Sequence, residues 1–220
     1  MPRSDDVIKQ SVESQLEWDT RVDASNISIR VDNGVVTLTG TVPTYRASRA
    51  AEDTAWIVMG VTSVINNLLV EYSSDITVPG DDEIKINVET ILSANPDINI
   101  LDMDISVTGG IVTLEGSVDS YWKILHAEEL ISNLPGVLGI KNNLAVVPSR
   151  DIVDETIARD VVDALERNAY VNEDNVTVKV DDGVVTLSGT VSSSYALNEA
   201  DITVSYTPGV KIINNNLRIR

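Results

Sequence analysis

The fold is decided by a nine-residue stretch that occurs three times. Residues 34–42 read Gly-Val-Val-Thr-Leu-Thr-Gly-Thr-Val, residues 110–118 read Gly-Ile-Val-Thr-Leu-Glu-Gly-Ser-Val, and residues 183–191 read Gly-Val-Val-Thr-Leu-Ser-Gly-Thr-Val. The copies begin 76 and then 73 residues apart, and a regular spacing of this kind is typical of tandem structural repeats. We therefore expect the 220 residues to form three copies of one small unit.

A strand and a tight turn are predicted immediately before each copy. Apolar and polar residues alternate there, which is the pattern of a strand with one solvated face. The apolar positions are Ile27, Ile29 and Val31; Met103, Ile105 and Val107; and Val176, Val178 and Val180. The dipeptides that follow, Asn33-Gly34, Gly109-Gly110 and Asp182-Gly183, are residue types that tolerate the positive φ angles of a hairpin. Each unit should therefore contain an antiparallel strand pair.

Two amphipathic helices are predicted around each hairpin. The first has apolar residues at every fourth position, namely Ile8, Val12 and Leu16; Ile84, Val88 and Leu92; and Ile157, Val161 and Leu165. Acidic residues precede each of these stripes and are expected to cap the free N–H groups at the start of the helix. The second helix carries the aligned residues Ala51, Ala127 and Ala200 and is expected to end at Gly60, Gly136 and Gly209.

A third strand closes each unit, because apolar residues and asparagine alternate after these glycines. The element order is then α-β-β-α-β. We predict an α+β fold of three tandem units, each a three-stranded mixed sheet with two helices on one face. The predicted domains are residues 1–74, 79–148 and 151–220, joined by linkers near 73–80 and 147–150.

Composition excludes several classes of function. The 34 acidic and 16 basic residues give a formal net charge of -18, which repels nucleic acids and anionic lipids, so no nucleic-acid partner is expected. Cysteine is absent, which removes thiolate catalysis and zinc-thiolate sites. No stretch reaches the roughly 18 apolar residues of a transmembrane helix. The N-terminus does not resemble a signal peptide, so we expect a cytoplasmic protein, or a periplasmic one if a signal has been removed.

Taken together, these motifs resemble the BON domain, named for bacterial osmotically inducible and nodulation proteins. The resemblance rests on the Gly-Val-Val-Thr-Leu-x-Gly-x-Val strand, the helices on either side of the hairpin, and the closing strand with asparagine. It covers nearly the whole chain. The resemblance implies a role in envelope maintenance, phospholipid contact or partner binding, and no catalytic motif belongs to the family.

The most unusual polar feature is a pair of asparagines that recurs on the third strand. The candidate interaction edge consists of Asn66, Asn67, Asn142, Asn143, Asn215 and Asn216. Two interpretations stay open for it: structural hydrogen bonding at the sheet edge, and a shared binding edge. The single histidine, His126, is expected to be an ordinary surface residue.

No catalytic, cofactor-binding or metal-binding residues are predicted. We hypothesise a non-enzymatic BON-repeat binding or scaffold protein, linked to osmotic or envelope stress, that presents three related interaction surfaces. The alternative is a phospholipid-binding or envelope-associated protein. The partner is then a protein or a phospholipid, and the sequence leaves its identity and the oligomeric state open.

Overall fold

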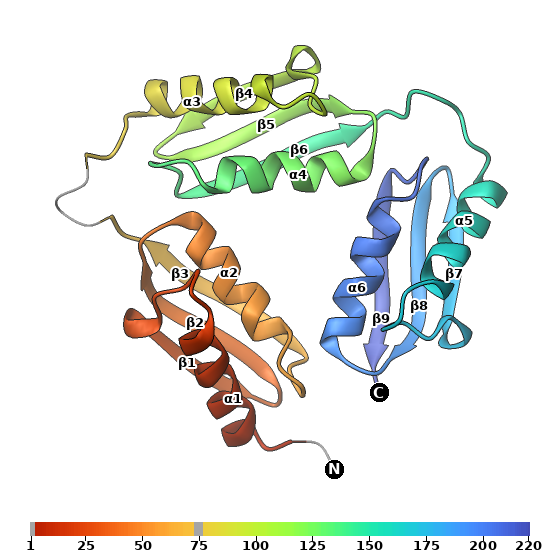
Figure 1. Ribbon diagram of the computed structural model, residues 1–220, viewed down its shortest axis with the longest axis horizontal. Coiled ribbons are helices and arrows are strands. Elements are labelled where there is room, and N and C mark those ends of the chain that lie inside the picture. Colours follow the sequence, from red (N-terminus) through yellow and green to blue (C-terminus); the bar gives the residue numbers. More distant parts are fainter. Residues whose placement is uncertain (1–2, 73–76) are drawn as a thin grey trace. The chain divides into compact units, whose positions relative to one another are not determined.

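A computed structural model describes residues 3–72 and 77–220 of the chain. It contains three three-stranded sheets, with the strand orders β1-β2-β3, β4-β5-β6 and β7-β8-β9. Two helices accompany each sheet (Figure 1). The predicted α+β class and the repeated α-β-β-α-β order are therefore confirmed.

The elements of the three copies correspond one to one. The first copy contains α1 (Asp5–Trp18), β1 (Ile27–Asp32), β2 (Val35–Val42), α2 (Tyr45–Trp56) and β3 (Ser63–Val70). The second contains α3 (Asp81–Ala94), β4 (Met103–Thr108), β5 (Ile111–Val118), α4 (Tyr121–Ser132) and β6 (Gly139–Val146). The third contains α5 (Asp154–Glu166), β7 (Val176–Asp181), β8 (Val184–Val191), α6 (Ser194–Ser205) and β9 (Ile212–Ile219). A short 3₁₀ helix precedes the first strand of each copy, at Ala24–Asn26, Ile100–Asp102 and Glu173–Asn175.

The first and third sheets both contain parallel and antiparallel strand pairs, as predicted. β1 pairs antiparallel with β2, and β2 pairs parallel with β3; β7, β8 and β9 repeat this arrangement. The hairpin turns place Asn33 at φ 52° and Asp182 at φ 48°, the left-handed region that asparagine and aspartate tolerate best among residues other than glycine. The turn prediction is confirmed.

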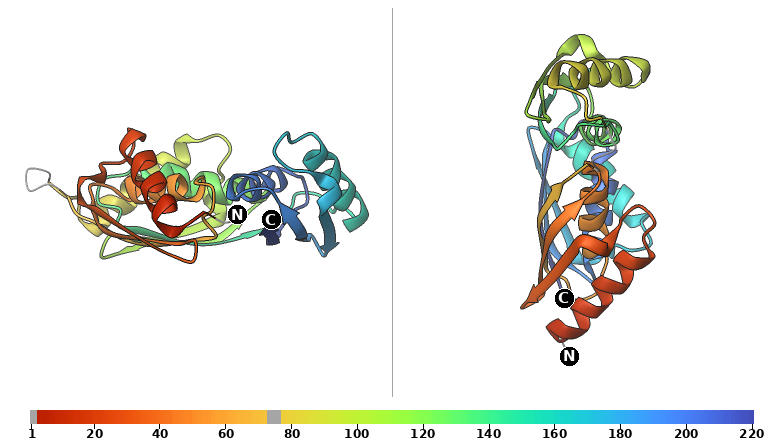
Figure 2. Two further views of the ribbon diagram at one scale, coloured as in Figure 1. Left: turned by 90° about the horizontal axis from the view of Figure 1, so that it is seen from below. Right: turned by 90° about the vertical axis from the view of Figure 1, so that its left-hand side faces the viewer.

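Both helices of a copy cover the same face of its sheet (Figure 2). In the first copy α1 contacts β1 and α2, while α2 contacts β2 and β3. The predicted stripe of α1, Ile8, Val12 and Leu16, is at most 2% exposed and packs with Val36 and Leu38 of β2. The third copy has the same core, built on the α5 stripe and the equivalent residues of β8. One face of each of these sheets is thus filled by helices, and the other lacks a helical layer of its own copy.

The chain divides into two compact units. One contains residues 1–94, 105–113 and 128–141, and the other contains residues 95–104, 114–127 and 142–220. The first sheet lies wholly in the first unit and the third sheet wholly in the second. The domain boundaries given above stay predictions, because the predicted linker 73–80 falls partly on residues 73–76, which lie outside the described part of the chain.

Candidate interaction surfaces

The first asparagine of each pair is a structural residue that ties the third strand to the second helix. Asn66 donates from its side-chain amide to the carbonyl oxygen of Ser48 at 3.0 Å, and its Oδ1 accepts from the backbone N–H of Leu68 at 3.1 Å. Asn142 and Asn215 make the equivalent bonds, to the carbonyl oxygens of Ile124 and Leu197 at 2.9 and 3.2 Å. Because the bonds recur in all three copies, these amides are committed to the fold.

The second asparagine of each pair is exposed instead. Asn67, Asn143 and Asn216 alternate with their neighbours along the strand, so they point to the face without helices. In the ladders Asn67 is level with Thr39 of β2, and Asn216 with Ser188 of β8. The structure therefore separates the six asparagines into three that bind the helix and three that are accessible to a partner. The shared binding edge itself stays a prediction.

The open face of the first and third sheets carries many hydroxyl and amide side chains, together with basic and aliphatic ones. We call these surfaces the open sheet faces. The first contains Ser28, Arg30, Thr37, Thr39, Thr41, Ile65, Asn67 and Leu69. The third contains Thr177, Lys179, Thr186, Ser188, Thr190, Ile212, Asn214, Asn216 and Arg218. Because the residues of a sheet are regularly spaced, these hydroxyl and amide groups present hydrogen-bond donors and acceptors to a partner at fixed distances.

An acidic residue lies beside the structural asparagine in the first and third copies, at Glu52 and Asp201. The amide of Asn66 also donates to Glu52 Oε2 at 3.2 Å. Burial raises the pKa of the Asp201 carboxyl, and a hydrogen bond from Asn215 opposes that shift. No acid in such a context was predicted; Glu52 and Asp201 occupy equivalent positions of their repeats, and this equivalence was the available signal. In Glu52 the carboxylate accepts from the structural amide, which is a supporting role.

The acids lie in the first turn of the first helix of each copy, as predicted, but the prediction that they cap its free N–H groups is wrong for Asp5, Asp81 and Asp154. The N-cap positions Ser4 and Val153 make no side-chain cap hydrogen bond. Instead, both carboxylate oxygens of Asp5 accept from the hairpin turn, from the N–H of Asn33 at 2.9 Å and that of Gly34 at 3.0 Å. Since the hairpin lies beside the helix end in the folded unit, its two free N–H groups compete successfully for the carboxylate.

The same carboxylate clamp exists in the other copies. Asp81 accepts from the N–H groups of Gly109 and Gly110 at 2.8 and 2.9 Å. Asp154 accepts from those of Asp182 and Gly183 at 2.8 and 2.9 Å. These aspartates hold the α-β-β part of each unit together and were not singled out from the sequence.

A second repeated contact joins the end of the first helix to the second helix. In the first copy Thr54 donates to Asp19 Oδ2 at 2.6 Å, and in the third copy Asn168 donates to Thr203 Oγ1 at 2.7 Å. At the equivalent position of the second copy, the side-chain amide of Asn95 lies 2.9 Å from Nε2 of His126. His126 is thus half-buried in a helix-to-helix contact and is not the plain surface residue that we expected.

The charge of Asp19 is well stabilised. Hydrogen bonds from Arg21 lower the pKa of Asp19 far below its usual range, burial opposes this, and the Thr54 hydroxyl lowers it further. Arg21 binds both carboxylate oxygens, with Nη2 to Oδ2 at 2.7 Å and Nε to Oδ1 at 3.0 Å. The arrangement is that of a charged structural tie.

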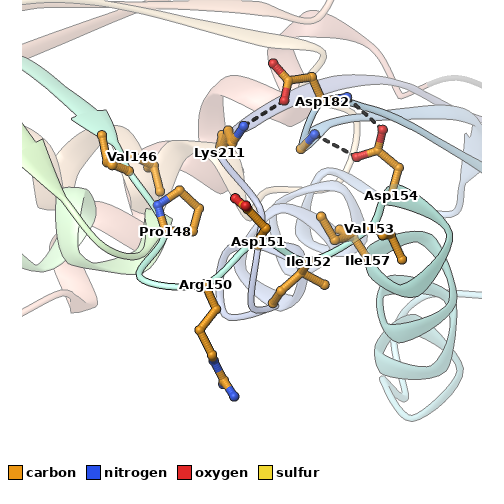
Figure 3. A pocket seen from close by; sticks show the side chains of 13 residues that line it. Val146, Pro148, Arg150, Asp151, Ile152, Val153, Asp154, Ile157, Asp182 and Lys211 are labelled. Carbon is orange, nitrogen blue, oxygen red and sulfur yellow. Dashed lines mark hydrogen bonds and ion pairs between the residues drawn. The ribbon is translucent and has the colours of Figure 1, made fainter.

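One hollow of about 660 Å³ lies at the start of the third copy. It is lined by residues between Val146 and Val153, by the first turn of α5, and by Asp182 and Lys211 (Figure 3). The acidic residues among them are Asp151, Asp154 and Asp182. Three of these charges are already paired or hydrogen-bonded, because Lys211 Nζ lies 2.8 Å from Asp182 Oδ1 and Asp154 accepts from the hairpin N–H groups. The first and second copies have Thr62 and Leu138 in place of Lys211, so the hollow is not a shared site.

The described residues contain neither a metal site nor a membrane-spanning helix. Within 3–72 and 77–220, no group of three or more histidine and acidic side chains is arranged to hold a metal ion. Over the same residues, no helix has the length and apolar character needed to cross a bilayer.

The fold and these surfaces define a class of tandem α+β repeat proteins in which the same contacts build each unit and one sheet face is left without a helical layer. The family model described as "BON domain" matches residues 4–72, 80–148 and 153–220. The chain belongs to the BON domain family, as the sequence resemblance indicated.

Two curated proteins are similar in sequence. "Osmotically-inducible protein Y" of Escherichia coli (strain K12) is 30% identical over 143 residues, covering 64% of this chain and 71% of that protein. "Uncharacterized protein in gshII 5'region" of Anaplasma centrale is 29% identical over 126 residues, covering 56% of this chain and 81% of that protein.

One similar solved structure is CdsD, a structural protein of the type III secretion system of Chlamydia trachomatis. The match has 14% sequence identity and covers 98% of this chain and 92% of the CdsD chain. Its TM-score is only 0.28. This likeness supports no conclusion about the function of the present chain.

Proposed function

We propose that this chain is a non-enzymatic binding or scaffold protein, linked to osmotic or envelope stress, that presents three related interaction surfaces. The proposal rests on the separation, within a copy, between polar residues that hold the fold together and polar residues that are exposed to solvent. The repeated polar contacts, such as the Asp5 clamp and the Asn66 tie, are committed to the fold. The open sheet faces of the first and third copies carry further polar residues that these contacts do not use, and the two faces differ from each other.

The differences between the open sheet faces support related but unequal binding. The central row of the first face is Arg30, Thr37 and Ile65, whereas that of the third is Lys179, Thr186 and Asn214. Linked surfaces of this kind bind a repeated partner through effective concentration, even where each surface alone binds weakly. Several weak surfaces in one chain are the arrangement that favours a scaffold.

The stress link comes from the name of the relative, which is osmotically inducible. If it holds for this chain, the amount of the protein should rise after an osmotic upshift of the producing cells. Quantitative immunoblotting before and after the upshift measures this, with a heat shift as the control. An unchanged amount after the upshift counts against the stress link and leaves the binding proposal to its own test.

The binding proposal is tested with charge substitutions on the open sheet faces. The full chain is tagged and used to capture proteins, and each captured protein is quantified for Thr39→Lys, Ser188→Lys and the double variant. We expect the genuine partner to be reduced by each single change and reduced further by both. Gln15→Lys introduces the same charge at an exposed position of α1 and should leave capture unchanged. Equal capture by all the variants contradicts the proposal.

A phospholipid surface is the second candidate, and one observation favours it. The Trp18 side chain is 83% exposed at the end of α1, and exposed tryptophan is typical of membrane-interface contacts. The net charge of -18 opposes anionic bilayers. Flotation with neutral and anionic vesicles tests this candidate: binding that Trp18→Ser abolishes supports it, and no flotation with either vesicle contradicts it.

A further inference from the structure

The last strand of the first sheet has one free side. β3 pairs with β2 along its whole length, from Ser63 to Val70, and it is the final strand in the order β1-β2-β3. Its other edge has no strand partner among the described residues. A free edge presents main-chain N–H and C=O groups that another extended chain can match.

This edge lacks the usual protection against pairing. Proteins commonly place charges or proline on edge strands, or make them short. The eight residues Ser-Val-Ile-Asn-Asn-Leu-Leu-Val of β3 contain neither charge nor proline. The opposite edge strand, β1, has six residues and carries Arg30 and Asp32.

The sister strands show what is missing from β3. In β3, Ile65 and Leu69 lie on the open sheet face and are 46% and 68% exposed. At the position of Ile65 the second copy has Lys141, and at the position of Leu69 the third copy has Arg218. The second and third copies thus place one charge each on their edge strand at the positions where the first copy exposes a large apolar side chain.

The sequence of β3 is also complementary to itself. If two copies of the strand pair antiparallel about Asn67, the Asn67 side chains lie opposite each other. Ile65 then faces Leu69 of the second copy, and Val64 faces Val70 on the other side of the sheet. Ile65 and Leu69 then bury aliphatic surface against each other, Asn66 lies opposite Leu68 on the helix-covered face, and β3 contains no charged residue to oppose the pairing.

We propose that β3 is a self-association edge, and that two copies of this chain join through antiparallel β3 strands centred on Asn67 into a continuous six-stranded sheet. The interface is isologous, since the same residues serve on both sides of the two-fold axis. The occupant is a second copy because the exposed residues of the strand match themselves, with Ile65 opposite Leu69 and Asn67 opposite Asn67. The net charge of -18 opposes close approach, but β3 itself is neutral at the contact.

The first test uses the absence of cysteine from the chain. Asn67→Cys introduces a single thiol whose partner lies directly across the proposed two-fold axis, within reach of a short bismaleimide. Asn216→Cys and Asn143→Cys, at the equivalent exposed positions, are the matched controls. We expect the cross-linked dimer to form at least about tenfold faster for Asn67→Cys, because pairing raises the effective concentration of its thiol. Equal rates for the three variants overturn the proposal.

The second test measures mass in solution by sedimentation or light scattering over a range of concentrations. The unmodified chain should form a dimer, and Leu69→Lys and Ile65→Lys should be monomers at concentrations where it does. Ile212→Lys, on the equivalent strand and 52% exposed, should still form the dimer. Circular dichroism verifies that each variant is folded. A monomer for the unmodified chain at every concentration, or a dimer retained by Leu69→Lys, overturns the proposal.

Discussion

Single carboxylates decide how each unit is joined, and their roles depend on distant parts of the chain. Asp5 accepts from two N–H groups that lie 28 and 29 positions further on. Asp6, the next residue, is exposed at the same turn of the helix and takes no part in this clamp. Asp5 should therefore contribute much more to the stability of the first copy than the adjacent Asp6.

Replacing Asp5 should loosen the first hairpin. Asp5→Ala removes two charge-assisted hydrogen bonds and leaves two turn N–H groups without their acceptor. We expect a loss of about 1–3 kcal/mol in the free energy of unfolding of the first copy. Denaturant unfolding measures the loss, and amide hydrogen exchange at Asn33 and Gly34 locates it. Asp6→Ala should stay within about 0.5 kcal/mol of the unmodified chain, and equal losses for both would contradict the clamp.

The tie at Asp19 should make the first copy sensitive to acid. Its pKa is lowered below the usual 3.8 in the folded chain. A carboxyl with a lowered folded pKa contributes stability that is complete above the unfolded pKa and is lost as pH falls through the folded one. The difference in stability between the unmodified chain and Asp19→Asn should therefore be largest near neutral pH and shrink below about pH 4.

The third copy supplies the control for this experiment. Asn168 occupies the position of Asp19 and is itself uncharged; its shorter hydrogen bond, at 2.7 Å, is to the neutral Thr203 hydroxyl, and a longer one, at 3.4 Å, is to Glu199. The cost of Asn168→Ala, measured by thermal unfolding at the same pH values, should therefore not shrink in this way. A constant cost of Asp19→Asn from pH 7 to pH 3 would show that its charge does not contribute.

At the scale of the elements, local sequence patterns predicted the helices and strands well, but they did not predict the hydrogen bonds that join those elements. The stripe of Ile8, Val12 and Leu16 and the alternation of β1 are local signals, and both are confirmed. The roles of Asp5 and Asn66 depend on contacts between elements that are 18 to 29 positions apart, and no periodicity encodes such contacts. Their recurrence at the repeat spacing was the available signal.

Gly40 of β2 is required by close packing, whereas Gly109 in the second hairpin turn is not. A Cβ on Gly40 would lie 1.9 Å from the carbonyl oxygen of Asn26, at a backbone φ of 121°. A Cβ on Gly109 would meet nothing within 4 Å, at φ 57°, and the other copies have Asn33 and Asp182 there. The two glycines thus have different reasons to be present.

Substitutions at these glycines should change stability in opposite directions. Gly40→Ala should cost about 3 kcal/mol or more, because β1 and β2 would have to separate. Gly109→Asn should be neutral or stabilise by up to about 1 kcal/mol, because asparagine tolerates this φ and restricts the unfolded chain. Denaturant midpoints of the two variants measure both effects. A mild Gly40→Ala would contradict the close approach of the strands.

At the scale of the whole molecule, charge opposes the compact state. A net charge of -18 on 220 residues produces self-repulsion. The attractive pairs are mostly exposed, as in Lys9 with Glu13 and Lys85 with Glu89, whose side chains are each about 45% exposed. Exposed pairs contribute little, so repulsion should outweigh attraction.

Added salt should therefore stabilise the chain and favour its self-association. The Debye length falls from about 30 Å at 0.01 M to about 8 Å at 0.15 M, which screens repulsion across the molecule more than contacts between neighbouring side chains. We expect Tm to rise over this range, and the dimer through β3 to become more abundant, because bringing two chains of charge -18 together is the more strongly opposed step. Comparing sodium chloride with potassium chloride at equal ionic strength separates screening from specific ion binding. A falling Tm would mean that the exposed ion pairs outweigh the net repulsion after all.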